Sequence, residues 1–389
     1  MIVDPLSVMS EEHNSRSGTS VRESKVSKDV SGVRVLRSAA IAEQVLFLDG
    51  LTGTGKTMLA PILSTLRRVE VQRIEHIYEY ICHLRFLGRI EEDAAIALIR
   101  MYADIACYNA MIARESNFRY SDLSGVLSNP GGWRYLLRLF KADGEAVVTR
   151  IKRERPILQL VSHGVPGAAS LLFSAMGERL TLVEMVRHPL YLIEHWYSYM
   201  HRWGTDPRDF AICLKHGEAN LPWFALGWEE KYLACNKMDR VIYTLEWLLS
   251  LFEQGLSGLG QSARGRVVVI PFEHFVMDPW PFLSRLEELL RSRRTWATNR
   301  LLRKQKVPRQ LWTDGRDLKI YRRYAWEPPS KNSTEAHELR KRWDFAATEA
   351  SKESMRVLGQ LCEEYERKYL KQDLRLDSFA GGDSQGAER

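Results

Sequence analysis

A glycine-rich segment at residues 50–57 constrains this chain more than any other feature. Its sequence, GLTGTGKT, fits the pattern GxxxxGK[ST], a loop whose backbone N–H groups surround phosphate oxygens. A short apolar run at 45–49 precedes it, and apolar residues at helical spacing follow over 58–68. The segment therefore predicts a strand–loop–helix unit that binds an anionic group, with Lys56 adding a positive charge.

Further short apolar runs indicate strands that are buried on both faces. They cover residues 157–162, 181–186 and 266–270 and lack clean alternation. The helical patterns that separate them cover residues 71–114, 189–203, 239–254 and 279–292. This alternation predicts an α/β fold with three layers, in which helices flank a central parallel sheet and a helical insertion follows the first strand–helix unit.

The composition predicts one large folded domain at 44–372 between two flexible ends. Residues 1–43 are rich in Ser and charge and contain no aromatic residue, and residues 373–389 are similar. Such segments cannot bury enough apolar surface to fold. Within the domain we expect a helical insertion at 71–150 and a basic segment at 291–330.

Charge and cysteine usage narrow the class of protein. The net charge is +7, and residues 291–323 hold 12 Lys and Arg against two acids, which indicates an anionic ligand or partner. The five cysteines are widely spaced and form no CxxC, so a disulfide scaffold or zinc ribbon is not expected. No signal peptide and no apolar run of about 20 residues is visible, so we expect a cytoplasmic protein without a membrane span.

The strand ends argue against nucleotide hydrolysis. Kinases and NTPases with this loop also use an acid that helps to hold Mg²⁺, commonly Asp at the end of a neighbouring strand. The later strands predicted here run instead into Ser162, Arg187 and Pro271. The sequence thus favours another user of the same loop.

Four segments, in this order, resemble the sulfotransferase superfamily, whose donor is 3′-phosphoadenosine 5′-phosphosulfate. The loop aligns without a gap to the family's G-x-P-[KR]-S-G-T-T, with Gly53 at the position of the Lys or Arg and the cation, Lys56, three residues later. Ser162-His163 is similar to the family's strand end Thr-His, whose histidine is the general base.

The other two segments lie further along the chain. The stretch that begins at Arg187 is similar to the signature R-[DNH]-P-x5-S-x-Y, whose Arg and Ser bind the 3′-phosphate of the cofactor. His195 stands at the serine position, and Ser198 is the nearest serine. Residues 267–290 are similar to the family's strand-[YF]-E-[DHN]-[LF]-x3-P and the helix after it.

The resemblance implies a set of site residues. His163 and Lys56 are the catalytic candidates, and a neutral imidazole, with its ordinary pKa near 6.5, suits proton acceptance at neutral pH. Glu273 is a competing base. The cofactor-binding candidates are Gly53, Thr54, Gly55, Lys56, Thr57, Met58, Arg187, His195 and Ser198. No metal is required, and Arg322 and Arg323 are candidates to clamp the cofactor.

The implied activity is in-line transfer of a sulfuryl group to a hydroxyl or amine of a small-molecule, lipid or saccharide acceptor. Residues 113–120 either face the acceptor or cofactor or cap a helix. Nucleic acid is not expected as a partner, and the oligomeric state stays open. One alternative is a P-loop kinase or NTPase, because GTGKT is close to that class. Another is a catalytically inactive binding protein, because Gly53 and His195 depart from the family pattern.

Overall fold

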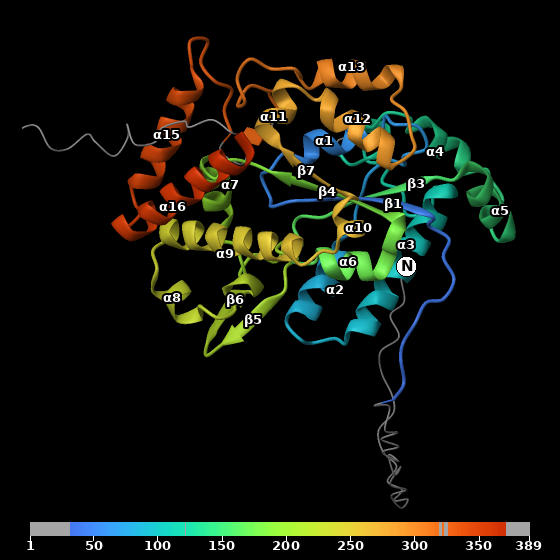
Figure 1. Cartoon of the computed structure of the whole chain (residues 1–389), viewed down its shortest axis with the longest axis horizontal. Helices are drawn as coiled ribbons and strands as arrows, with labels where there is room; N and C mark the ends of the chain where they lie inside the picture. Colours follow the sequence, from blue (N-terminus) through green and yellow to red (C-terminus); the bar gives the residue numbers. More distant parts are fainter. Residues whose placement is uncertain (1–31, 121, 319–320, 323–325, 371–389) are drawn as a thin grey trace, which may run out of the picture. The chain divides into compact units, whose positions relative to one another are not determined.

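A five-stranded parallel sheet organises the chain (Figure 1). The computed structural model describes residues 32–120, 122–318, 321–322 and 326–370. In spatial order the strands are β2 (Arg73–Ile74), β3 (Ile157–Val161), β1 (Gln44–Asp49), β4 (Leu180–Val186) and β7 (Val267–Pro271). The predicted α/β fold is confirmed. Of the strands in this sheet, β2 alone was not predicted, because two residues are too short to show a period.

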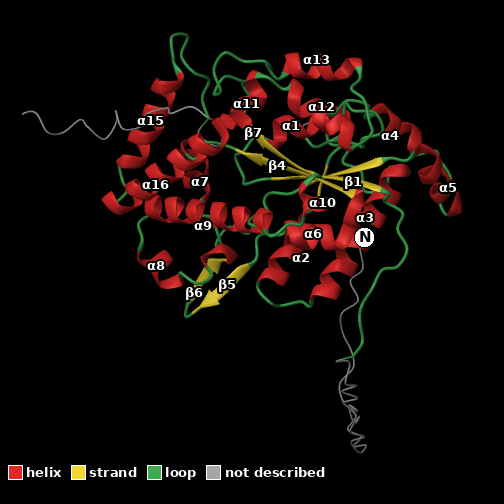
Figure 2. Ribbon diagram, in the orientation of Figure 1, coloured by secondary structure: helices red, strands yellow, loops and turns green. Residues whose placement is uncertain are grey.

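Helices cover both faces of the sheet (Figure 2). Along β1, Leu46 and Leu48 face one layer while Val45 and Phe47 face the other, as the two-residue period of a strand requires. The first layer contains α1 (Lys56–Leu63), α11 (Phe272–Met277), α12 (Trp280–Leu289) and α13 (Trp296–Lys304). The second contains α2 (His76–Phe86), α3 (Glu92–Met111), α5 (Glu145–Glu154) and α6 (Ala169–Met176). Both layers are continuous apolar cores.

The predicted helical insertion lies between β2 and β3. It contains α2, α3, α4 (Trp133–Arg138) and α5, with the short η1 (Val126–Ser128). The buried carboxylate of Asp104 on α3 accepts the backbone N–H groups of Ile41 and Ala42 at 2.8 and 3.0 Å. The entry to β1 is therefore fixed on the second layer. Residues 1–31 and 371–389, which include most of the predicted leader and all of the predicted tail, lie outside the described residues.

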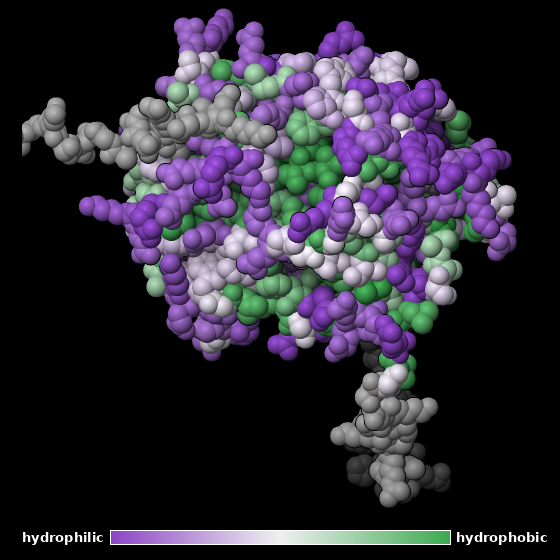
Figure 3. Space-filling view, in the orientation of Figure 1, coloured by the Kyte–Doolittle hydropathy of each residue, from purple (hydrophilic) through white to green (hydrophobic). Residues whose placement is uncertain are grey.

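A third apolar cluster packs beside the sheet. Its helices are α7 (Leu190–Tyr199), α9 (Lys237–Ser257), α15 (Glu335–Ala347) and α16 (Lys352–Tyr365), which is followed by η4 (Glu366–Leu370). The smaller elements are η2 (Gly177–Arg179), β5 (Cys213–His216), β6 (Ala219–Pro222), η3 (Trp223–Ala225), α8 (Glu229–Ala234) and α10 (Gln261–Arg264). In Figure 3 hydrophilic residues dominate the visible face, and apolar residues surface near its centre, over β4 and β7. None of the helices described is both long enough and apolar enough to cross a membrane.

The topology predicts a ligand site at the carboxyl ends of β1 and β3, and we call this region the crevice. These strands are neighbours in the sheet, yet β1 leads into α1 on one face and β3 leads into α6 on the other. Where two adjacent connections leave in opposite directions, the loops separate and a ligand site forms. The loops that line this crevice are 50–55 and 162–168.

Candidate functional site

The glycine-rich loop is a tight turn between β1 and α1. The N–H and the hydroxyl of Thr54 both bond to the carbonyl of Leu51, at 3.2 and 2.8 Å, which closes the turn. Gly55 has φ +104°, and a Cβ there would lie 2.5 Å from the ring of Phe272. Only glycine satisfies both conditions. Thr57 is exposed in the first turn of α1.

Lys56 joins the two sides of the crevice. Its ammonium donates to the carbonyls of Gly50 and Leu51, the latter at 3.0 Å, and to that of His163 at 3.4 Å. Burial lowers the pKa of Lys56 to about 8, although Asp49, Glu79 and Glu184 oppose the shift. The side chain therefore remains mostly charged at neutral pH, and its ammonium lies between the loop and the segment after β3.

Two guanidinium groups gather on the other side of the loop. Arg187, directly after β4, donates from Nη1 to the carbonyl of Gly53 at 2.9 Å. Its guanidinium carbon lies 4.2 Å from the ring centroid of Phe272, and that of Arg309 lies 5.5 Å from the same centroid. Both arginines contact aromatic and backbone groups, and neither pairs with a carboxylate among the described residues.

The electrostatics of this arginine pair favour an anion. Burial lowers the pKa of Arg187, and burial together with the charge of Arg187 lowers the pKa of Arg309 to about 10. The buried Nε of Arg187 has no hydrogen-bond partner in the described part of the chain. Two partly desolvated like charges with an unused donor are costly unless an anion binds beside them.

His195 rather than Ser198 faces the loop. The imidazole carbons of His195 lie 3.3 Å from the Cβ position of Gly53. Burial, with Arg187 and Lys56 nearby, lowers the pKa of His195 to about 3, so its ring is neutral. The hydroxyl of Ser198 instead donates to the carbonyl of His195 at 2.7 Å, within α7.

Met58 belongs to the helix more than to the loop. Its N–H bonds to the carbonyl of Gly55 at 2.9 Å, and its side chain is buried in the first layer. The sulfur of Met58 also contacts Nη2 of Arg309 at 3.4 Å. Through that contact Met58 supports the arginine pair.

His163 lies on the opposite side of the crevice, directly after β3 and Ser162. Its side chain is 48% exposed, and its Nδ1 lies 3.0 Å from Oε1 of Glu79 on α2. The backbone N–H of His163 donates to the same oxygen at 2.7 Å. The nitrogen Nε2 of His163 has no hydrogen-bond partner among the described residues, so hydrogen bonds hold the ring only at Nδ1.

Glu273, the competing base, is buried within the packing. Its Oε1 accepts the N–H of His188 at 3.0 Å, and its Oε2 accepts the hydroxyl of Tyr365 at 2.6 Å. Only 1% of the residue is exposed. The carboxylate connects the segment after β4 to α16.

A pair of buried acids lies beneath the loop, and our sequence reasoning missed it. Asp49 ends β1 and stands opposite Glu184 on β4. Asp49 accepts the hydroxyl of Ser162 and, at 3.1 Å, the N–H of Val165, so it ties the two crevice loops together. Burial, with Asp49 nearby, raises the pKa of Glu184 well above its ordinary value. In the sequence, Asp49 at the end of the first strand was the signal that could have revealed this pair.

Two cavities lie at this edge of the sheet, and only the smaller one is lined by the crevice loops. One of about 20 Å³, room for roughly one water, lies against Asp49 and Arg187. The other, of about 120 Å³, lies at the carboxyl end of β2 and is lined mainly by polar groups from 72–75 and 115–117. The hydroxyl of Ser116 there is buried and has no partner among the described residues. Part of the predicted cluster at 113–120 therefore lines a pocket.

The basic segment supplies the site with a different arginine from the one expected. Arg322 is exposed and pairs with Asp317, and Arg323 lies outside the described residues. Arg309, which follows α13, instead lies near Arg187 on the ring of Phe272. Spacing gave no reason to choose it among 12 cations.

The comparisons with known proteins give distant likenesses only. No protein-family model matches the sequence, and no curated protein matches it. The sulfotransferase domain from the curacin biosynthetic pathway is 12% identical, with a TM-score of 0.36 over 83% of this chain and 98% of that one. The sulfotransferase domain of the Synechococcus PCC 7002 olefin synthase is 12% identical, with a TM-score of 0.37 over 85% and 96%. A sulfotransferase from Mycobacterium avium is 13% identical, with a TM-score of 0.36 over 84% and 77%. At these values the likenesses assign no activity to the chain.

Proposed function

We propose that this protein is a sulfotransferase that uses 3′-phosphoadenosine 5′-phosphosulfate. One observation carries the proposal. Lys56 and Arg187 bond to carbonyls of one glycine-rich loop, and Arg309 lies on the same Phe272 ring as Arg187. None of the three has a carboxylate ion pair in the described part of the chain. A ligand with two separate anionic groups satisfies this arrangement.

The two anionic groups of the donor match the two cationic places. The loop amides and Lys56 suit the 5′-phosphosulfate, because they surround a small volume at the start of α1. Arg187, with Arg309 beside it, suits the 3′-phosphate, which a guanidinium binds through two parallel hydrogen bonds. His195, neutral and next to Gly53, adds a ring nitrogen near the same place.

The reaction follows from these positions. The acceptor oxygen or nitrogen attacks sulfur while the bond from sulfur to the phosphate oxygen breaks. The electron pair leaves with adenosine 3′,5′-bisphosphate, and Lys56 offsets the charge that gathers on its 5′-phosphate. The proton of the acceptor passes to Nε2 of His163. The protein's part is to align the reactants and to stabilise charge.

The acceptor enters, in this proposal, from the side of β2. Glu75 lines the polar cavity of about 120 Å³. The next residue is His76, whose ring stacks on that of His163. Its lining of charged, amide and hydroxyl groups suits an acceptor that carries hydroxyl or amine groups. A small molecule, a saccharide or the head group of a lipid meets this requirement.

Calorimetry tests the proposal. Adenosine 3′,5′-bisphosphate should bind at least about tenfold more tightly than ATP with Mg²⁺, because Arg187 and Arg309 match a 3′-phosphate that ATP lacks. Transfer of labelled sulfate from the donor to any hydroxyl or amine acceptor would complete the assignment. Binding without transfer to a broad acceptor panel would favour the inactive binding protein instead.

A P-loop kinase or NTPase is the second candidate. Thr57 is exposed in the first turn of α1, where a hydroxyl helps to hold Mg²⁺ in that class. Both oxygens of Asp49 accept the N–H of Val165, however, so this acid supports the loop. Tight binding of ATP–Mg²⁺ with no affinity for the bisphosphate would decide for this candidate.

A further inference from the structure

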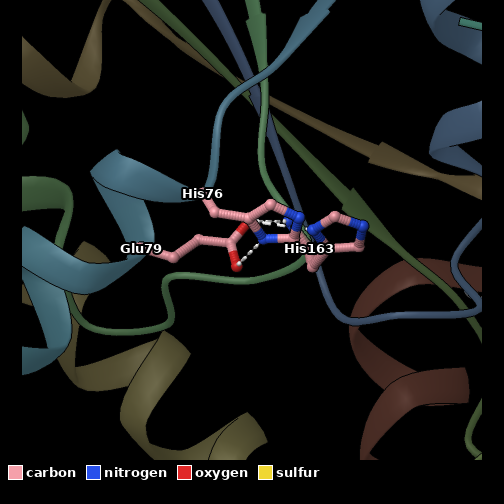
Figure 4. Close-up of side chains that lie close together, drawn as sticks. All are labelled: His76, Glu79 and His163. Atoms are coloured by element: carbon pink, nitrogen blue, oxygen red, sulfur yellow. Dashed lines mark hydrogen bonds and ion pairs between the residues drawn. The ribbon is translucent and has the colours of Figure 1, made fainter. Parts of the chain in front are cut away.

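Two side chains of α2 meet the residue that follows β3. Figure 4 shows the carboxylate of Glu79 beside the rings of His76, one turn away on α2, and of His163. Oε2 of Glu79 lies 3.4 Å from Nδ1 of His76, and Oε1 lies 3.0 Å from Nδ1 of His163. The two imidazole rings are stacked, with centroids 4.7 Å apart and planes 6° from parallel. One carboxylate thus serves two histidines.

This contact determines where the hydrogen of His163 sits. An ionised carboxylate only accepts hydrogen bonds, so Nδ1 of His163 must carry the hydrogen. The hydrogen bonds from His163 and His76 to Glu79 outweigh the effect of burial and hold the pKa of Glu79 well below its ordinary value, so the carboxylate is ionised. In the neutral ring Nε2 then keeps its lone pair. That nitrogen lies on the far side of the ring from Glu79.

His76 bonds to the same carboxylate and stacks on His163. Its hydrogen bond to Glu79 raises the pKa of His76 above the ordinary value, despite partial burial. Because the rings are stacked 4.7 Å apart, a charge on one ring would oppose a charge on the other.

Other titratable groups near these side chains include Glu75, Lys56 and His83. Glu75 precedes α2, and the ammonium of Lys56 lies 3.4 Å from the carbonyl of His163. His83, one turn beyond Glu79, approaches the carbonyl of Gly164 at 3.3 Å, and burial lowers its pKa to about 4. His83 is therefore neutral, and it braces the same loop without adding charge.

The geometry favours proton handling over metal binding. The three groups offer ligand atoms within 4.8 Å of one another, a set that divalent metals use. A metal bonds to an imidazole nitrogen in the plane of the ring, and two stacked, nearly parallel rings have no common in-plane point. Metal binding would require one ring to leave the stack.

We infer that Glu79 and His76 are positioning residues that hold His163 with Nε2 ready to accept the proton of the acceptor. Glu79 fixes the ring through Nδ1 and fixes the backbone through the N–H of the same residue. His76 covers one face of the ring. The inference rests on the proposed function only for the identity of the reaction.

Nitrogen NMR on the full chain tests the hydrogen position without any substrate. At pH 7.5 the His163 ring should show a protonated Nδ1 and an unprotonated Nε2. In Glu79→Gln the fixed pattern should be lost, with Nε2–H populated to a measurable extent. A wild-type ring with its hydrogen on Nε2 would overturn the inference, whether or not the variant folds.

Kinetics supply the second readout. With 4-nitrophenol as acceptor, Glu79→Gln should lower kcat at least about tenfold and alter the pH profile, since loss of the orienting carboxylate of a histidine base costs up to about 10⁴-fold. The Kd for adenosine 3′,5′-bisphosphate should change less than about threefold. Glu230→Gln is the matched control, because it removes the carboxylate from the exposed pair His216–Glu230, 2.9 Å apart. Equal losses in both variants would contradict the inference.

Two further outcomes are decisive. If Zn²⁺ added to chelator-treated protein binds with submicromolar affinity and shifts the His76 and His163 signals together, the group is a metal site and the inference is wrong. If no acceptor is sulfated but the Nδ1–H pattern is present and depends on Glu79, the proposed function fails while the positioning role stands.

Discussion

Lys56 contacts both halves of the crevice through one ammonium group. Its three carbonyl partners come from the glycine-rich loop and from His163, which is 107 residues away in the sequence. Among the described residues its hydrogen-bond partners are all carbonyl groups. Such a cation is ready to exchange one of them for a ligand oxygen, because a charge-assisted bond to an anion is stronger.

Lys56→Ala should abolish transfer and weaken binding of adenosine 3′,5′-bisphosphate. A lost charge-assisted contact typically costs about 1.5–3 kcal/mol. Calorimetry and a transfer assay measure the two effects. The control is Lys152→Ala, at an exposed position of α5. Wild-type turnover in the first variant would show that the loop does not hold the phosphosulfate.

Arg187→Ala should weaken binding of the 3′-phosphate of the ligand more than binding of its 5′-phosphate. The Kd for adenosine 3′,5′-bisphosphate should rise far more than that for 5′-AMP, which lacks the 3′-phosphate. Arg309→Ala should show the same preference more weakly, because Arg309 is also bonded to the carbonyls of Gln305 and Trp312. Equal losses for both ligands would mean that Arg187 acts only on the structure of the loop.

His163→Ala should lower the transfer rate and leave cofactor affinity nearly intact. Removal of a general base typically costs about 10²–10⁴-fold. In the wild-type protein the rate should rise with pH, because only a neutral imidazole accepts a proton. Rates across pH are compared for wild type, His163→Ala and Glu273→Gln, with folding checked by circular dichroism. Full activity in His163→Ala with collapse in Glu273→Gln would move the base to the glutamate.

At the scale of elements, α4 is held to the chain before β2 by a buried ion pair. Glu70 accepts from both terminal nitrogens of Arg138, at 2.6 and 3.0 Å, and from the hydroxyl of Tyr135 at 2.6 Å. Because Tyr135 also lines the polar pocket, this anchor helps to place the proposed acceptor side.

Glu70→Gln should destabilise the fold by about 3–5 kcal/mol, since it leaves the buried Arg138 unpaired. Burial alone would raise the pKa of Glu70, but the bonds from Arg138 and Tyr135 lower it. The carboxylate therefore stabilises the fold above its unfolded-state pKa of about 4.5, and this contribution fades as pH falls. Urea unfolding at pH 7 and at pH 4 measures both effects, with exposed Glu154→Gln as the control. If the difference in unfolding free energy between wild type and Glu70→Gln is as large at pH 4 as at pH 7, the ion-pair account is contradicted.

At the scale of the whole molecule, strand order places the groups in a line along one sheet edge. Arg187 follows β4, the loop follows β1, His163 follows β3, and the polar pocket lies at β2. In the proposed reaction this is the sequence of nucleotide, phosphosulfate, base and acceptor. Beneath the line, Glu184 places a carboxyl group in the core.

Glu184→Gln should stabilise the protein at high pH. The folded-state pKa of Glu184 is raised by burial, so the folded chain holds a proton that the unfolded chain releases above about pH 4.5. Stability then falls as pH rises, by at most about 1.4 kcal/mol per pH unit for one group. Thermal unfolding at pH 5 and pH 8 should show a gain that grows with pH, and exposed Glu178→Gln should show none. A gain independent of pH would mean that Glu184 is ionised in the fold.

The sequence by itself determined the contiguous features of this protein. The loop at 50–57, its flanking strand and helix, and the strands at 157–162 and 181–186 were predicted because each depends on neighbours a few residues away. Hydrophobic periodicity and glycine placement are local properties, so they can be recognised in the amino-acid sequence alone.

Only the tertiary structure decided which distant groups meet. Arg309 lies beside Arg187, Glu79 bonds to His163, and Asp49 bonds to Ser162, although each pair is separated by 84 residues or more. These contacts follow from strand order and from the faces on which α1 and α6 leave the sheet. Crossover direction and register are set by the packing of whole layers, and no local pattern records them.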